Sequence, residues 1–257
     1  MPDNDPVEPD EEVLAGGNVA AEVVRVGQTV RKPAGPQTPA VEALLTHLNA
    51  AGLSMVPRTL GRDDSGRHVI EYIAGPTAHT LAPLDPAGLH RVGRMIRDLH
   101  DVSESFSPPL RARWCTAIPP DREDLICHHD LAPWNMVMDG DRWVFIDWDG
   151  AGPGSRLWDL AYAIKGFVPL EAGGDPSSDR PRIRALADGY RLFAPERQEL
   201  AALLGTRTRA MYDLLRRGAA TGEQPWARLC AEGHGEYWEQ SANYIERHQP
   251  DWAEALR

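Results

Sequence analysis

The chain has 257 residues, a formal net charge of −11 and 42% hydrophobic residues, which suits one globular domain or two closely joined lobes. No apolar run approaches the ~20 residues that span a membrane, and no basic stripe of the kind that binds nucleic acid is present. The acidic, proline-rich N-terminus is unlike a signal peptide, so we expect a cytoplasmic protein without membrane or nucleic-acid partners.

The first part of the chain predicts a tail followed by strands. Residues 1–12 contain six acids and no base, which is typical of a disordered acidic tail. Residues 13–32 predict three short strands. Gly17 and Asn18 lie in the first turn, whose backbone N–H groups could close over phosphates, although an ordinary hairpin turn fits equally well. Arg31 and Lys32 are adjacent in the third strand and point to opposite faces, so only one can bind a phosphate, and the sequence leaves both open.

A helix is predicted next, from Thr38 as N-cap to about residue 51. Glu42 is its candidate as the ion-pair partner of the phosphate-binding cation, and a plain surface position is the alternative. Residues 56–60 and 67–73 predict a hairpin. A further helix opens at Asp85 and is expected to end at His100, with apolar residues at helical spacing. Beyond residue 156 the pattern is helical, roughly over 157–167, 181–193, 196–216 and 223–248.

Residues 127–150 contain an H-x-D-x-x-x-x-N string and, one hairpin later, two further acids: His128, Asp130, Asn135, Asp147 and Asp149. The turn residues 139–141 predict the hairpin, and a turn centred on residue 141 would place Asn135 opposite Asp147. Opposed residues have Cβ atoms roughly 4.5–5.5 Å apart, so an amide and a carboxylate oxygen would converge there and suit Mg2+. A slip of one residue would turn the side chains to opposite faces, and a solvated acidic loop is the alternative.

These residues resemble the aminoglycoside phosphotransferase and choline kinase-like family, which has the protein-kinase-like fold. The resemblance implies an α+β, bilobal fold. Residues 13–75 would form a small N-terminal nucleotide-binding lobe with an antiparallel sheet. Residues 76–257 would form a larger, mainly helical catalytic and acceptor-binding lobe.

The resemblance also implies phosphoryl transfer from ATP or GTP with Mg2+. Asp130 corresponds to the catalytic residue, and Asn135 and Asp147 correspond to the metal ligands. His128 is implied as a residue that shapes the loop, and Asp159 as a loop anchor or N-cap.

Residues 69–75 resemble the hinge between the lobes, where the backbone of Glu71, Tyr72 and Ile73 would contact the nucleobase. The sequence also departs from its relatives. His129 stands where they usually have a small residue such as Gly, and Ala132 stands where protein kinases usually have Lys. The D-F-G and A-P-E motifs are missing as well, which favours a small-molecule kinase over a protein kinase.

The acceptor is the least defined part of this interpretation. Glu232, Glu236 and Glu239 have spacings that can place them on one helix face, and with Asp149 they could bind a cationic acceptor; a solvated face is the alternative. By resemblance, the acceptor would be a hydroxyl of an aminoglycoside or similar amine-rich antibiotic, and the protein would confer resistance. The alternatives are a metabolic kinase for choline, a sugar or an amino alcohol, and a non-catalytic immunity protein that sequesters its ligand.

Overall fold

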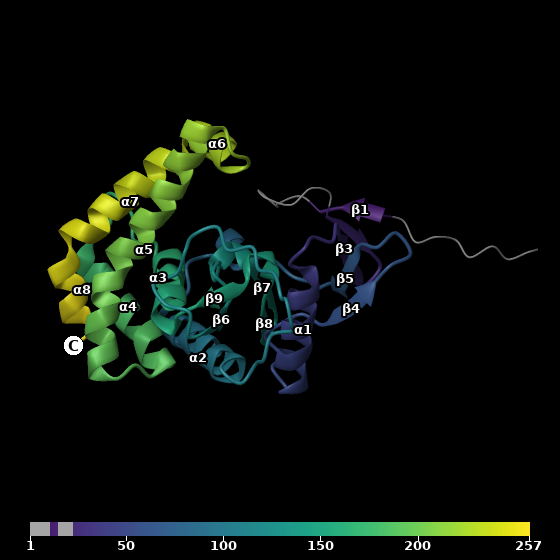
Figure 1. Ribbon diagram of the computed structural model, residues 1–257. Helices are drawn as coiled ribbons and strands as arrows, with labels where there is room; N and C mark the ends of the chain where they lie inside the picture. Colours follow the sequence, from purple (N-terminus) through teal and green to yellow (C-terminus); the bar gives the residue numbers. More distant parts are fainter. Residues whose placement is uncertain (1–10, 15–22) are drawn as a thin grey trace, which may run out of the picture.

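The computed structural model describes residues 11–14 and 23–257. A five-stranded antiparallel sheet with the order β1-β2-β3-β5-β4 lies at one end, and a larger group of helices forms the other end (Figure 1). The strands of the sheet are β1 (Glu11–Val13), β2 (Val24–Val26), β3 (Thr29–Lys32), β4 (Thr59–Arg62) and β5 (His68–Glu71). The predicted fold class, a small antiparallel sheet followed by a mainly helical part, is confirmed.

The sheet begins earlier than the sequence suggested. Glu11 and Glu12 were assigned to the acidic tail, but they pair with Val26 and Arg25 of β2. The remainder of the expected tail, and the turn that contains Gly17 and Asn18, lie outside the described residues.

Helix α1 (Thr38–Ala50) connects β3 to β4. Its N-cap is Gln37 and not Thr38 as predicted, because the Thr38 hydroxyl instead accepts a hydrogen bond from the Gly35 N–H at 2.8 Å. The helix buries one apolar face against the rest of the protein: Val41, Leu44, Leu45 and Leu48 are each at most 1% exposed.

The loop of residues 128–135 holds the H-x-D-x-x-x-x-N string, and we call it the catalytic loop after the role that the resemblance implies. The hairpin of β7 (Met136–Asp139) and β8 (Arg142–Phe145) follows this loop. Asp139 pairs with Arg142, so the turn consists of two residues, with Gly140 at a φ of +53°. The predicted register is therefore wrong by one residue. Asn135 lies opposite Ile146, whose N–H it accepts at 2.8 Å.

This hairpin is bonded to the segments on both sides of it. The Phe145 N–H donates to Met55 O at 2.9 Å, and the Met138 N–H donates to Pro76 O at 2.9 Å. Gly75 has a φ of +129°, and a Cβ there would lie 2.6 Å from the Met138 carbonyl oxygen. Only glycine lets the chain pass this close to the hairpin.

The remaining elements form the helical part: η1 (Ala78–Thr80), α2 (Pro86–Ser103), β6 (Leu125–Cys127), η2 (Pro133–Asn135), η3 (Trp148–Gly150), β9 (Gly152–Gly154), α3 (Arg156–Phe167), α4 (Pro176–Tyr190), α5 (Ala194–Thr221), α6 (Trp226–Leu229), the π-helical turn Cys230–His234, α7 (Gly235–Arg247) and α8 (Gln249–Ala255). As predicted, Asp85 caps α2 by accepting the Gly88 N–H, but the helix continues past His100 to Ser103. Within the described residues, no helix has the length and apolarity needed to cross a membrane.

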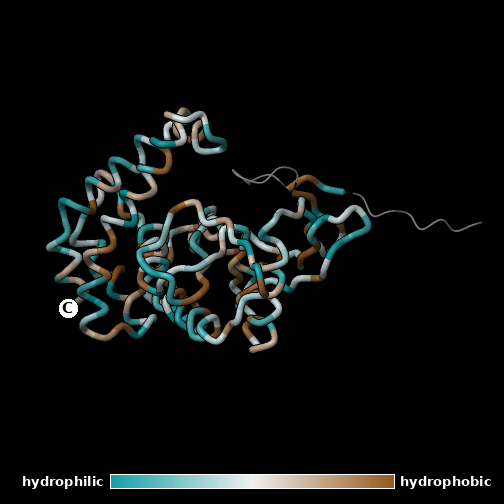
Figure 2. Tube along the Cα trace, viewed as in Figure 1, coloured by the Kyte–Doolittle hydropathy of each residue, from teal (hydrophilic) through white to brown (hydrophobic). Residues whose placement is uncertain are grey.

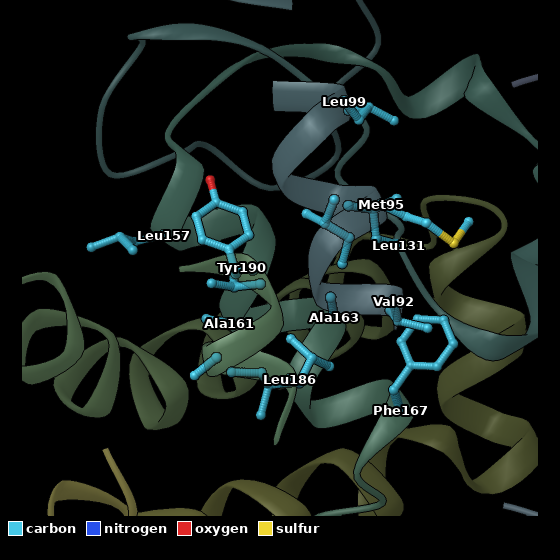
Figure 3. Packing of buried hydrophobic residues seen from close by; sticks show 14 of the residues in the cluster. Val92, Met95, Leu99, Leu131, Leu157, Ala161, Ala163, Phe167, Leu186 and Tyr190 are labelled. Carbon is cyan, nitrogen blue, oxygen red and sulfur yellow. The ribbon is translucent and has the colours of Figure 1, made fainter. Parts of the chain in front are cut away.

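The main core lies where α2, α3 and α4 meet. Apolar side chains from these helices, among them Leu99, Ala161 and Leu186, pack in one buried cluster (Figure 3). The outer faces of the peripheral helices are mostly hydrophilic (Figure 2). Gly93 of α2 allows close contact with α4, because a Cβ there would lie 2.1 Å from the Leu186 carbonyl oxygen. Leu131 of the catalytic loop is fully buried in the same cluster, so the core supports the loop directly.

Candidate functional site

The catalytic loop follows β6 and is anchored by Asp159 in the first turn of α3. The Asp159 carboxylate accepts the backbone N–H groups of His128 at 3.1 Å and His129 at 2.9 Å, and lies 3.1 Å from Nε2 of His100. Burial favours the neutral acid, but the hydrogen bond and charge of His100 outweigh it and hold the pKa of Asp159 at about 2. The N-cap of α3 is Ser155, so Asp159 is placed as an anchor of the loop.

His128 connects the loop to the segment that precedes Asp147. Its Nε2 lies 3.0 Å from the carbonyl oxygen of Ile146, and its Nδ1 accepts the Asp130 N–H at 3.2 Å. The ring also packs on Trp148, with 4.5 Å between the ring centroids. These contacts give His128 the loop-shaping position that the sequence suggested.

Asp130 and Asn135 are brought together directly. The Asn135 side-chain amide donates to the Asp130 carboxylate at 2.7 Å and to the Asp130 carbonyl oxygen at 3.0 Å. Asn135 is 6% exposed, and Asp130 is half-buried. Because the amide nitrogen is used by Asp130, the Asn135 Oδ1 is left as an oxygen ligand for a cation.

Asp147 and Asp149 lie beside the lysine of β3. Lys32 is 6% exposed, and its Nζ lies 2.8 Å from Asp149 and 3.9 Å from Asp147. Asp147 leaves the strand with a φ of +60°, and its carboxyl group interacts electrostatically with Lys32, Asp149 and Asp130. Arg31 points to the other face and approaches Asp63 at 3.6 Å.

These oxygens fit a hard divalent cation. Asn135, Asp147 and Asp149 offer one amide and two carboxylates, the donor types that Mg2+ and Ca2+ prefer. Clustered carboxylates repel one another unless a cation or a proton lies among them. The Lys32 ammonium offsets part of that charge, and a metal ion bound by these residues would offset the rest.

Glu42 is not paired with Arg31 or Lys32 in the described part of the chain. It lies 3.3 Å from Arg62 at the end of β4, and 4.0 Å from Nε2 of His68. Lys32 is neutralised by Asp149 instead. The expected ion pair between the β3 cation and Glu42 of α1 is therefore replaced by the pair of Lys32 with Asp149, which follows the hairpin.

Two backbone N–H groups of the expected hinge are already hydrogen-bonded. The N–H of Glu71 donates to Arg58 O at 2.9 Å, and the N–H of Tyr72 donates to Gln28 O at 3.0 Å. Both groups are therefore used within the small lobe. Ile73 is 6% exposed and packs in a small apolar cluster with Val137, Val144 and Ile146. Ile146 immediately precedes Asp147 in the sequence.

The three glutamates expected to bind the acceptor do not share one helical face. Glu232 belongs to the π-helical turn and pairs with Arg228 at 3.1 Å, whereas Glu236 and Glu239 belong to α7. Gly233 between them has a φ of +98° and interrupts the helix. Glu232 and Glu236 are both exposed.

Aromatic residues that the sequence analysis missed line the loop on this side. The pKa of Tyr162 is raised by burial and by the nearby Asp130 carboxylate. Its ring stacks on Trp238 with a centroid distance of 6.0 Å and meets the edge of Trp134 at 6.3 Å. Trp134 is 39% exposed, so this aromatic wall, formed by Tyr162, Trp134 and Trp238, reaches the surface beside Asp130.

Two buried cations were also missed. Lys165 is 2% exposed, and its Nζ lies 4.2 Å and 4.4 Å from the ring centroids of Tyr237 and Trp238. Its position after the apolar run of residues 160–164 was a signal in the sequence. Arg207 of α5 is 3% exposed and has no such signal among 25 arginines.

Comparison with known proteins agrees with this geometry. A model of the phosphotransferase enzyme family matches residues 110–203, which include the catalytic loop and the hairpin. A trifolitoxin immunity protein from Rhizobium leguminosarum bv. trifolii is 31% identical over 204 residues, which make up 73% of this chain and 77% of that protein.

Solved structures show the same fold. A choline/ethanolamine kinase family protein from Mesorhizobium loti has a TM-score of 0.61 and 20% identity, covering 96% of this chain and 92% of the other. An amicoumacin kinase in complex with AMP-PNP, Ca2+ and Ami has a TM-score of 0.68 and 13% identity, covering 95% and 89%. The described chain is therefore folded like a small-molecule kinase.

Proposed function

This chain belongs to the phosphotransferase family of aminoglycoside and choline-type kinases, and we propose that it transfers the γ-phosphoryl group of ATP or GTP to a hydroxyl of an antibiotic or toxin. The relative that is an immunity protein supports a protective role, in which the modified compound loses its toxicity to the cell. Such a kinase would draw on the nucleotide pool of the cytoplasm.

The observation that carries the proposal is the grouping around Asp130. Its carboxylate is hydrogen-bonded to Asn135 at 2.7 Å, and it interacts with Asp147, which in turn lies 3.9 Å from Lys32. The proposed base Asp130 and the proposed metal ligand Asn135 come from the loop. The second proposed ligand, Asp147, follows the hairpin, and the buried cation Lys32 comes from β3. Phosphoryl transfer needs these parts together.

Asp130 would act on the acceptor. A hydrogen bond from the Asn135 amide holds its carboxylate, which also interacts with the Tyr162 hydroxyl. Asp130 would orient the acceptor hydroxyl and accept its proton. Asn135 and Asp147 would hold Mg2+, with Asp149 close by. When bound, the metal neutralises charge on the transferring phosphate.

We assign the phosphate-binding role to Lys32, since it lies beside these acids and Arg31 points to the opposite face. Asp149 replaces Glu42 as its partner. The apolar cluster around Ile73 would form one side of the nucleobase site. We place the division between the lobes at Gly75, where the chain passes closely over the hairpin.

The acceptor would meet the aromatic wall. Trp134 is the exposed ring of this wall, and an aromatic ring beside Asp130 attracts cationic groups, which supports an amine-bearing acceptor. Glu232, paired with Arg228, contributes less than the sequence suggested. A metabolic amino alcohol with the same charge would satisfy this wall too, so the acceptor has to be found by assay.

A second candidate function is sequestration without catalysis, because the relative's name refers to immunity and not to a kinase. The two can be separated with Asp130→Ala. We would measure nucleotide consumption with Mg2+ for the wild type and this variant across aminoglycosides, other antibiotics, choline and sugars, with mass analysis of the products. A phosphorylated product made only by the wild type supports the kinase. Protection of cells that survives Asp130→Ala, without any product, supports sequestration.

A further inference from the structure

A buried arginine from a distant helix reaches the catalytic loop. Arg207 lies in α5 and is 3% exposed. Its Nη2 donates to the backbone carbonyl oxygen of His129 at 3.1 Å. His129 immediately precedes Asp130, so this contact acts on the backbone from which the Asp130 side chain projects.

The burial of this guanidinium is energetically unfavourable. Its Nε and Nη1 atoms have no hydrogen-bond partner in the described part of the chain, and no carboxylate there lies within ion-pair distance. Burial lowers the pKa of Arg207, and stacking over Tyr162 at 4.3 Å and Trp158 at 5.3 Å offsets only part of the cost. An apolar residue would fill the same space more favourably. The charge therefore requires a role other than packing.

The loop backbone at this point is held in an unusual conformation. His129 has a φ of +68°, the left-handed region that costs a non-glycine residue about 1–3 kcal/mol. Contacts of its N–H, its ring and its carbonyl oxygen hold it there. Its N–H donates to Asp159 at 2.9 Å, its ring Nε2 lies 2.9 Å from Pro153 O, and its carbonyl oxygen accepts from Arg207. Removing Arg207 would release the one contact that lies next to Asp130.

Arg207 also reaches Asp130 through Tyr162. The guanidinium stacks on the Tyr162 ring, and the hydroxyl of that ring interacts with the Asp130 carboxylate. Asp130 and Asp159 both interact electrostatically with Arg207. Ala132, two residues after Asp130, carries no charge, and Arg207 brings a buried positive charge to this loop from α5.

We propose that Arg207 is a positioning residue, which fixes the orientation of the Asp130 carboxylate through the His129 carbonyl and the Tyr162 ring. The proposal rests on the proposed function for its kinetic consequence. Its structural consequence, the ordering of residues 128–131, does not depend on which acceptor is used.

The test compares Arg207→Met, Arg207→Lys and, as a control on the same helix, Arg209→Met. Arg209 pairs with Glu246 at 2.7 Å on the surface and is remote from the loop contacts of Arg207. We would measure kcat and KM for nucleotide and acceptor, the unfolding midpoint in urea, and backbone hydrogen exchange of residues 128–131.

For Arg207→Met we expect kcat to fall by about tenfold to a hundredfold, the scale of a misplaced catalytic group, with KM for nucleotide within about twofold. The urea midpoint should be unchanged or higher, and exchange at residues 128–131 should accelerate. Arg207→Lys should recover part of kcat, and Arg209→Met should match the wild type. A wild-type kcat in Arg207→Met, or a loss of activity no larger than the loss of folded protein, would overturn the proposal.

Failure of the proposed function gives a different result. If the wild type phosphorylates no acceptor, the exchange measurement still decides. Faster exchange at residues 128–131 in Arg207→Met, with a wild-type urea midpoint, would support positioning of the loop. Unchanged exchange would overturn it.

Discussion

The buried ammonium of Lys165 makes a quantitative prediction possible. Lys165 has no carboxylate within ion-pair distance in the described residues, and burial lowers its pKa from 10.5 to about 8. A difference of this size between the folded and unfolded states corresponds to roughly 3 kcal/mol of destabilisation at neutral pH. Its contacts with the Tyr237 and Trp238 rings and its hydrogen bond to the Tyr237 hydroxyl together return about 1–2 kcal/mol. Lys165→Met, which keeps the length of the side chain, should therefore stabilise the protein by about 1–2 kcal/mol at neutral pH.

The pH dependence follows from proton binding. Below a pH of about 8, Lys165 is protonated in both states and the full penalty is present. Between about 8 and 10.5 the unfolded chain binds more protons than the folded one, so the stability contributed by this group rises with pH. Above 10.5 both states are neutral and the penalty disappears. The advantage of Lys165→Met should therefore shrink as the pH rises.

The assay is urea unfolding followed by far-UV circular dichroism at a pH of about 7 and again at about 9.5, for the wild type and Lys165→Met. Arg209→Met serves as a surface control whose effect should not change with pH. If Lys165→Met is destabilised equally at both pH values, the lysine is favourably paired in the folded protein and the reasoning is refuted.

Three further predictions follow from the site and the core. Asp147→Ala should abolish Mg-dependent turnover in a magnesium titration, while Glu232→Gln keeps it; full activity of Asp147→Ala would contradict the metal assignment. Asp159→Asn should cost about 2 kcal/mol near neutral pH, because the folded pKa is about 2, and the difference from wild type should fade as the pH falls from about 4 towards 2 in acid unfolding; a constant difference would contradict it. Gly93→Ala should cost about 3 kcal/mol or more in thermal unfolding, because the added Cβ would meet the Leu186 carbonyl oxygen at 2.1 Å; a wild-type melting temperature would show that α2 and α4 can separate freely.

Local chemistry explains what was predictable from the sequence. The hairpin followed from its turn residues, and the fold class followed from the family resemblance of the H-x-D-x-x-x-x-N string and the acids after it. The hairpin register failed because the turn has two residues, and Asp139 pairs with Arg142. A shift of this kind changes every pairing without changing the composition.

Other features depend on contacts between distant segments. Glu42 was expected to pair with the β3 cation, but Glu42 pairs with Arg62, and Lys32 of β3 pairs with Asp149. Arg207 reaches the loop from 78 residues away, and no local pattern distinguishes it from a surface arginine. Lys165 has a local signal, because a charge directly after the apolar run of residues 160–164 indicates a buried cation.

The hairpin of β7 and β8 has a mechanical consequence. Asn135 precedes its first strand and Asp147 follows its second, so both lie at its open end. The hairpin is also bonded to Met55, to Pro76 and, through the 2.9 Å pair of Arg142 with Glu71, to the end of β5. A rotation of the sheet relative to the helices would therefore displace β7 and β8, which are flanked by the proposed metal ligands Asn135 and Asp147. Denaturation should accordingly proceed as one cooperative event. Residues 13–75 produced alone would lack Arg142, whose ion pair with Glu71 holds the end of β5.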